Sequence, residues 1–509
     1  MHVFEWIIAL LVGAVVLTAC ARALGLPYPS LLALGGVALA FVPAAPDFRL
    51  DPQLSLALFV APVLLDAAFD TSLRDLKRFW IPITALVIIA VGITTVAVAW
   101  LAHTLVPSMP WSAAIALGAI VAPPDAAAAS AILRALQIPH RIVVILEGES
   151  LLNDATALLV YRIAVSVTMG ATLTPTGAGL QGLAMIGSAI VGFGLAHLLT
   201  RIMRHVTDIP SAIVLQFAST FGIWILADEA GLSAIVTVVA YAITAARLTP
   251  TSTPPQLRLP SFAVWETSVF VLNVLAFVLI GLQVRPILAG LDIDERQHYL
   301  RIALSVLGMV VAVRIAWVMF YNRAAKYKAL LFGAGTWWPG RYTPTLNGST
   351  VIAWCGMRGI VTLATAYALP EGFPFRDLIL LCAFTVVVGT LIAQGLTLRP
   401  LLAALRLTGD GAVEDEIHLA KEALAIVAAE VLDGDGSETA QVLRAEFVTS
   451  VVADEDGTIS ERSARNALRA RILAAQRLAL VRMRDNAMIG DDAFHRIEER
   501  LDWAEVNVR

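Results

Sequence analysis

Apolar segments long enough to cross a membrane follow one another along most of the chain. Each holds roughly 17–25 residues, and a helix of about 20 residues spans the hydrocarbon layer of a bilayer. Together they predict an all-α polytopic membrane protein with about thirteen transmembrane helices. The expected spans are residues 3–24, 29–45, 53–69, 80–103, 112–134, 142–168, 178–201, 211–228, 232–247, 262–284, 301–320, 349–369 and 377–402.

Two of these spans are interrupted. The fifth contains Ala-Pro-Pro-Asp at 122–125, where proline removes backbone donors and breaks a helix. The twelfth contains Cys-Gly-Met-Arg-Gly at 355–359. Spans 1–6 and 8–13 can form two inverted six-helix repeats, and the breaks then fall in equivalent helices, 5 and 12. Such paired broken helices predict a transport site near the middle of the membrane.

The chemistry changes after residue 402. Residues 409–509 are rich in charge and hold no spanning segment. We therefore predict a transmembrane domain over residues 1–402 and a soluble helical C-terminal domain over 403–509, with a regulatory or structural role. Helical patterns cover 437–453 and 459–485, and an earlier amphipathic helix is predicted by the 3,4 spacing of Ile417, Ala420, Leu424, Val427 and Val431.

Charge and cysteine usage refine this prediction. Only 15% of the residues are charged, against about 25% in soluble domains. Basic residues gather in alternate loops, and by the positive-inside rule this places the N-terminus outside and the C-terminal domain in the cytoplasm, at the cell membrane. The first segment lacks a basic start, so we expect a spanning helix and not a cleaved signal.

The three cysteines lie in apolar runs, which argues against disulfides and against a metal site formed by cysteines.

A polar cluster interrupts the sixth span at 147–154, which reads Glu-Gly-Glu-Ser-Leu-Leu-Asn-Asp. Carboxylates at membrane depth are costly and should face a cavity, a partner or an ion. In a helix, Glu147, Ser150 and Asp154 share one face, which can meet a passing ion. Glu149 and Asn153 share a neighbouring face, which can join a protein network. We expect Glu147 to line a cytoplasmic funnel. Apolar sequence on both sides disfavours the alternative of an interfacial charge cluster.

Two further carboxylates lie in predicted spans. Asp125 follows the break in the fifth span, where prolines free backbone carbonyls. Carboxylate and carbonyl oxygens suit a hard cation, and the lack of soft ligands argues against transition metals. Asp66 lies late in the third span and is either part of the membrane site or an interfacial charge beside a basic loop.

Two arginines fall inside spans, Arg314 in the eleventh and Arg358 in the twelfth. A buried arginine needs a partner. We expect Glu149 to pair with Arg358, and Glu266 to be a candidate for Arg314. These structural ion pairs would leave Asp154 as the carboxylate free to titrate.

At these motifs the chain resembles the monovalent cation/proton antiporters, and within them the electroneutral sodium/proton exchanger branch. The resemblance covers residues 1 to about 402 and rests mainly on 147–155, the break at 122–125, and Gly-Met-Arg-Gly-Ile-Val-Thr-Leu-Ala at 356–364. Lesser matches are Leu-Pro-Tyr-Pro at 26–29, Leu-Ile-Gly-Leu-Gln at 279–283 and Gln-Gly-Leu-Thr at 394–397.

The resemblance implies roles for the site residues. Asp154 would carry the ion and the proton, with Asp125 and Ser150 as further Na⁺ ligands and Asp66 lining the funnel. Glu149 and Arg358 match the family's buried ion pair. Asn153 stands where the electrogenic branch has a second aspartate, which implies electroneutral exchange.

One position departs from the family pattern. The family usually reads Thr-Asp-Pro at the first break, whereas this chain reads Pro-Asp-Ala at 124–126. A hydroxyl ligand is lost, although the carbonyl of Pro124 remains available. The departure affects the expected cation preference and not the class of activity.

We therefore expect a secondary active antiporter that exchanges Na⁺, or Li⁺, for H⁺ by alternating access, with cation and proton competing for Asp154. The alternatives are a K⁺/H⁺ antiporter with the same mechanism and a cation-sensing membrane protein that signals through its C-terminal domain. No enzyme or cofactor motif and no nucleic-acid partner is predicted. The partners are the cation, H⁺, the lipid bilayer and, from the resemblance, a second copy in a homodimer with a role in pH homeostasis.

Overall fold

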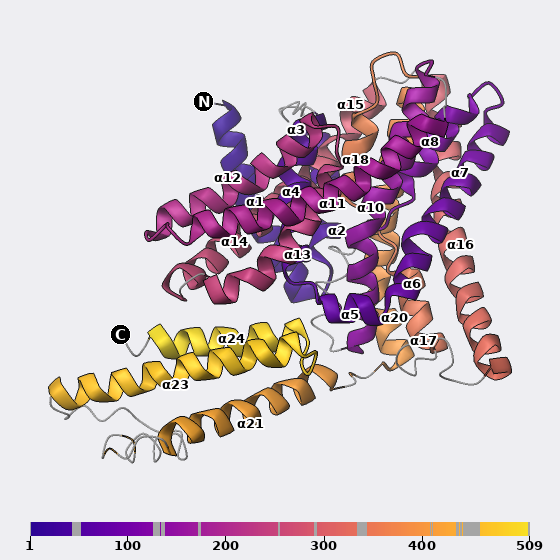
Figure 1. The fold of residues 1–509 in the computed structure, drawn as a ribbon. Helices are drawn as coiled ribbons and strands as arrows, with labels where there is room; N and C mark the ends of the chain where they lie inside the picture. The colour runs from indigo at the N-terminus through magenta and orange to yellow at the C-terminus, as the bar shows by residue number, and fades with distance from the viewer. Residues whose placement is uncertain are drawn as a thin grey trace.

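The computed structural model is almost entirely helical (Figure 1). It describes residues 2–42, 52–125, 133, 138–171, 175–252, 255–289, 293–332, 344–407, 409, 411–433, 437, 440 and 459–506. No β-strand occurs in these described segments. This agrees with the all-α prediction.

The first half of the chain forms helices at the predicted apolar segments, some of them with π-helical stretches (η) inside. They are α1 (His2–Leu24), α2 (Tyr28–Ala40), α3 (Pro52–Ser55), η1 (Leu56–Val60), α4 (Ala61–Phe69), α5 (Leu73–Arg78), α6 (Trp80–Thr84), η2 (Ala85–Ala90), α7 (Val91–Leu105), α8 (Trp111–Val121), α10 (His140–Thr168), α11 (Pro175–Met203) and α12 (Ile209–Glu229).

The second half continues this pattern and ends in helices of a more polar character. They are α13 (Ala234–Ser252), α14 (Pro255–Leu282), α15 (Val284–Ala289), α16 (Ile293–Phe332), α17 (Leu346–Trp354), α18 (Ile360–Tyr367), α19 (Arg376–Thr390), η3 (Leu391–Gly395), α20 (Leu396–Leu405), α21 (Ala412–Asp433), α23 (Ile459–Asp485) and α24 (Asp491–Val506).

Six helical segments of the described chain are long and apolar enough to cross a membrane, and shorter apolar helices accompany them. The six are Trp80–Leu105, Gln181–Met203, Ile209–Glu229, Pro260–Ala289, Arg296–Lys328 and Arg376–Leu405. Each of the thirteen predicted spans overlaps one or more of these helices, although the end of the second span and most of the second half of the fifth lie outside the described residues.

The apolar helices pack as two groups. The broken-helix group consists of α7, α8, α10, α16, α17, α18 and α19, which pack mainly on one another. The α14 group consists of α1, α2, α4, α11, α12, α13 and α14. Within it α2 and α14 approach so closely at Gly36 and Gly281 that a side chain on either would meet backbone atoms of the other helix. Each group therefore has its own tight internal packing.

Both predicted breaks are present in the broken-helix group. α8 ends at Val121, and residues 123–125 are not helical. α17 ends at Trp354 and α18 begins at Ile360, and the five residues between them are not helical. Proline explains the first break and two glycines flank the second, as their backbone chemistry predicts.

The C-terminal helices α21, α23 and α24 form a cluster with its own apolar core beside the membrane helices (Figure 1). The predicted amphipathic helix is confirmed as α21, whose Ala420 and Leu424 pack against Leu480 and Phe494. The helix predicted over 459–485 is α23, whereas 437–453 lies almost wholly outside the described residues.

Candidate functional site

The polar cluster of the sixth span lies in the middle of α10, packed against α8. Glu149, Asn153 and Asp154 are buried, with 1%, 0% and 8% of their surfaces exposed. Glu147 and Ser150 are partly exposed. The helix thus carries its polar side chains to the place where the two broken helices meet.

The two breaks are joined by backbone and side-chain hydrogen bonds. The backbone N–H of Asp125 donates to the carbonyl of Met357 over 2.7 Å. The side-chain amide of Asn153 donates to the carbonyl of Pro124, also over 2.7 Å. Gly359 lies against the Asp125 carboxyl group, which would collide with any side chain at that position. The first break, the second break and α10 therefore form one site.

Arg358 binds carbonyl oxygens at both breaks. Its guanidinium donates to the carbonyls of Val121 and Ala122 over 3.0 Å each, and to the carbonyl of Gly356. These carbonyls are at the ends of α8 and α17, where the helix dipole places partial negative charge. The expected pairing of Arg358 with Glu149 is wrong in this structure, because broken helices supply unpaired carbonyls that satisfy the arginine instead.

Glu149 pairs with Arg314 of α16. The two side chains form a bidentate contact with distances of 2.6 and 2.9 Å, and Arg314 also donates to the carbonyls of Ile352 and Cys355. The candidate pairing of Arg314 with Glu266 is therefore wrong, and Glu266 is exposed. The ion pair ties α10 to α16 and to the end of α17.

Asp154, Asp125 and Asn153 supply oxygen atoms close to one another. Asn153 precedes Asp154 in α10 and is bound to the carbonyl of Pro124, the residue before Asp125. The side-chain oxygen of Asn153 is buried and accepts no hydrogen bond from the described residues. Buried acceptors without a donor are rare, and carboxylate and amide oxygens are what a hard cation requires. This arrangement can hold either a monovalent cation or a proton.

Two cavities lie between the helix groups. One, of about 460 Å³, is lined by Ala155, next to Asp154, and reaches Arg162 and Asp228, which are 48% and 42% exposed and form an ion pair. The other, of about 480 Å³, lies between α14 and α18, where Tyr367 donates to Gln283 over 2.9 Å. Both border the later halves of α10 or α14.

Asp66 lines a cavity other than these two. This cavity, of about 430 Å³, lies within the α14 group and is also lined by Asp70, Arg258, Trp265 and Glu266. The described lining of this cavity includes neither Asp125 nor Asp154. The structure thus brings together the predicted residues on α10 and at the breaks, and places Asp66 elsewhere.

One residue that contacts the second break, Thr390, was not predicted from the sequence. The hydroxyl of Thr390 accepts a hydrogen bond from the backbone N–H of Arg358 over 3.0 Å and donates to the carbonyl of Val386 over 2.7 Å. A threonine inside an apolar span, one segment after a break, was the available signal.

Comparison with known proteins gives a consistent result. The sequence profile of the family described as "Sodium/hydrogen exchanger, transmembrane" matches residues 7–404. The uncharacterized Na⁺/H⁺ exchanger Rv2287 of Mycobacterium tuberculosis is 30% identical, over 99% of this chain and 95% of its own length. The sodium, potassium, lithium and rubidium/H⁺ antiporter of Bacillus pumilus is 30% identical, over 74% of this chain and 58% of its own.

A solved structure has a similar fold. The sodium proton antiporter MjNhaP1 from Methanocaldococcus jannaschii superposes with a TM-score of 0.62 at 18% sequence identity. The match covers 81% of this chain and 98% of that one. At this identity the likeness concerns the fold alone.

Proposed function

The chain belongs to the sodium/hydrogen exchanger family, whose members are multi-pass membrane antiporters and not enzymes, and we propose that it exchanges Na⁺ for H⁺ one for one. Asp154 is the shared binding group for the cation and the proton. Asp125, Ser150, the carbonyl of Pro124 and the amide oxygen of Asn153 are the further candidate oxygens.

The observation that carries the proposal is the position of Asp154. It is a buried carboxylate on a membrane helix, next to Asn153, whose amide is anchored to the carbonyl of Pro124. The arginines nearby are occupied elsewhere, Arg314 by Glu149 and Arg358 by backbone carbonyls. Asp154 is therefore the carboxylate best placed to exchange a cation for a proton.

Competition at this carboxylate couples the two fluxes. A bare buried charge is costly to carry across a membrane, so the site crosses only when a cation or a proton neutralises it. Asn153 carries no titratable proton, which supports a one-for-one exchange. We propose that the broken-helix group moves against the α14 group, since the cavities lie between them.

Replacing Asp154 tests the assignment. We expect Asp154→Asn to abolish cation-dependent proton flux in proteoliposomes that contain a pH dye, while the purified protein remains monodisperse. The matched control is Asp208→Asn, because Asp208 is an exposed helix cap and asparagine caps equally well. Residual exchange by the Asp154 variant would exclude this residue as the carrier.

A K⁺/H⁺ exchange is the second candidate, supported by the Pro-Asp-Ala sequence at the first break and by the broad cation range in the name of the Bacillus pumilus relative. Pulses of Na⁺, Li⁺ and K⁺, each with valinomycin to set the voltage, separate the two. A response to Na⁺ that is insensitive to voltage supports the first candidate. A response to K⁺ alone supports the second.

A further inference from the structure

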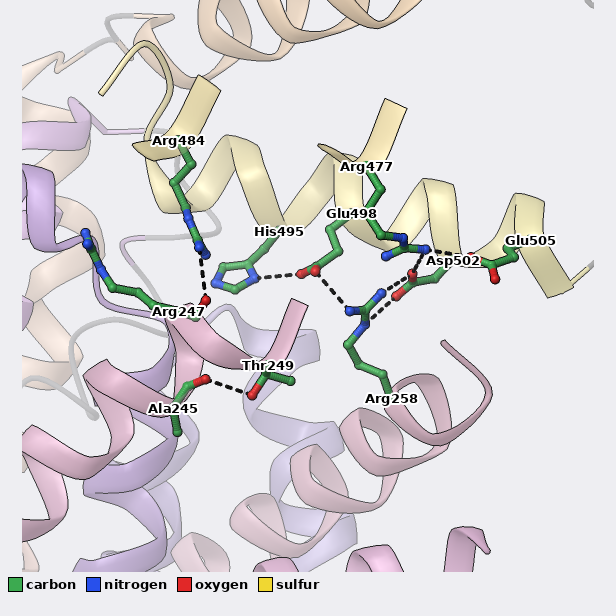
Figure 2. Close-up of polar contacts among 10 residues, drawn as sticks. All are labelled: Ala245, Arg247, Thr249, Arg258, Arg477, Arg484, His495, Glu498, Asp502 and Glu505. Carbon is green, nitrogen blue, oxygen red and sulfur yellow. Dashed lines mark hydrogen bonds and ion pairs between the residues drawn. The ribbon is translucent and has the colours of Figure 1, made fainter. Parts of the chain in front are cut away.

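The C-terminal helices contact the α14 group through a buried ion-pair network (Figure 2). Arg258, in the first turn of α14, contacts Asp502 through two nitrogens and lies 3.2 Å from Glu498, both on α24. All three are buried, at 2%, 0% and 3% exposure. Arg477 of α23 donates to Asp502 as well, over 2.9 Å. Removing one partner from a buried ion-pair network of this kind is strongly destabilising, because it leaves the other charge buried without a counter-ion.

Two further contacts extend the same attachment. The ring of His495 on α24 stacks on Phe69, the last residue of α4, with centroids 6.1 Å apart. Arg484 of α23 donates to the backbone carbonyl of Arg247 on α13. The C-terminal helices thus contact three helices of the α14 group, α4, α13 and α14. Figure 2 shows the contacts with α13 and α14.

The other end of α24 touches the broken-helix group. Asp492, at the start of α24, lies 3.3 Å from His140, which is the first residue of α10. His140 is also 3.1 Å from Asp75 on α5. Glu416 of α21 accepts from Arg74 on α5 over 2.6 Å and from the backbone N–H of Gly490. The helix that carries Asp154 is therefore tied directly to the C-terminal helices.

We propose that the C-terminal helices are a clamp that bridges the two helix groups and holds the antiporter in one conformation. This rests on the proposed alternating access, in which the groups move against each other. Because α24 is attached to both, at least one attachment must open in every cycle. The two cavities between the helix groups border the halves of α10 and α14 that point away from α24, so α24 bridges the groups at the opposite ends of these helices.

The two attachments differ in strength, which identifies the one that opens. The contact with Arg258 is desolvated, whereas the side chains of His140 and Asp492 are 20% and 46% exposed. Those of Arg74 and Glu416 are 21% and 23% exposed. Ion pairs that water reaches contribute little to stability, so the contacts with α10 and α5 break before the contact with Arg258. The clamp then stays on the α14 group while α10 moves.

Cross-linking tests which attachment opens. In a Cys20→Ala background, His140→Cys with Asp492→Cys is joined by a reducible bis-methanethiosulfonate reagent, and exchange is measured in proteoliposomes. We expect exchange to fall at least tenfold and to recover with dithiothreitol. The matched pair, Phe69→Cys with His495→Cys, joins α24 to the α14 group, where we expect exchange at the uncross-linked rate. Mass spectrometry measures the extent of cross-linking.

Unchanged exchange by the cross-linked His140–Asp492 pair would overturn the clamp, and loss of exchange in the Phe69–His495 pair would overturn the assignment of the end that opens. The reduced proteins separate this from the proposed function, since absence of exchange in every reduced protein would refute the function itself.

A single substitution provides an independent test. Asp492→Asn weakens the contact with His140, and we expect exchange two- to fivefold faster than in the unmodified protein. Glu414→Gln is the matched control, because Glu414 pairs with Arg496 inside the C-terminal helices and both side chains are 61% exposed. Equal rates for the two variants would argue against a clamp.

Discussion

Glu149 and Arg314 illustrate how a buried ion pair constrains the site at the level of single residues. Both side chains are at most 4% exposed, so neither can regain water if its partner is removed. The pair also holds the carbonyls at the end of α17 through Arg314. Its loss should therefore weaken the whole broken-helix group.

We predict that Glu149→Gln lowers the free energy of unfolding by about 3–5 kcal/mol, because it leaves the Arg314 charge buried without a counter-ion. The control is Asp228→Asn, which breaks the half-exposed pair with Arg162 and should cost roughly 0–1 kcal/mol. Thermal unfolding in detergent, followed by tryptophan fluorescence, measures both. Equal shifts would contradict the prediction.

At this scale, helical spacing correctly assigned residues to faces but could not choose partners. Glu149 had two arginines within reach, and their side chains are chemically identical. Arg358 turned to the carbonyls of Val121, Ala122 and Gly356, which are backbone atoms that exist as acceptors only because the helices break. The pattern of side chains along a sequence does not predict which backbone carbonyls are left as acceptors.

At the scale of elements, the close approach of the two breaks makes Gly359 sensitive to substitution. We predict that Gly359→Ala displaces the Asp125 carboxyl group and lowers the exchange rate about 10- to 100-fold. Gly308→Ala on α16 is the control, because the added carbon meets no described heavy atom within 4 Å apart from the backbone of its own helix. Exchange assays in proteoliposomes compare the two variants. A normal rate for Gly359→Ala would argue against the close contact between Gly359 and the Asp125 carboxyl group.

The positions of the elements were largely predictable, because apolar length and the residues Pro and Gly act locally. Both breaks fall where the proline pair and the glycine pair predicted. The π-helical stretches η1, η2 and η3 were not predicted, since they depend on packing between helices. The two inverted repeats stay a prediction.

At the scale of the whole molecule, the attachment of α24 should depend on pH through His495. Burial disfavours the charged ring, but the hydrogen bond and charge of Glu498, together with Asp70 and Asp491, raise the pKa of His495 above its ordinary value of 6.5. The protonated ring therefore strengthens the docked state. This contribution is fully present below the undocked pKa and is lost as the pH rises through the docked pKa.

We predict that hydrogen exchange in α24, corrected for its intrinsic rate, becomes faster as the pH rises above 6.5 and His495 loses its proton. His495→Gln should flatten this dependence. His418→Gln, at an exposed position of α21, is the matched control and should leave it unchanged. A pH dependence that survives in the His495 variant would locate the titrating group elsewhere.

The docking of α24 on α14 was beyond the sequence analysis. The chain holds 36 basic and 40 acidic residues, so charge alone does not identify the pairing of Arg258 with Asp502. A separation of 244 residues leaves no local pattern that connects them. The family resemblance ends near residue 402, before the partner begins.

The same separation has a consequence for biosynthesis. At translation rates of about 5–20 residues per second, Asp502 emerges roughly 12–50 s after Arg258. During that interval the arginine lies at the start of a membrane helix without its final counter-ion. The helix that begins near Arg258 is therefore made well before α24, and the docking of α24 on it is a late step in folding.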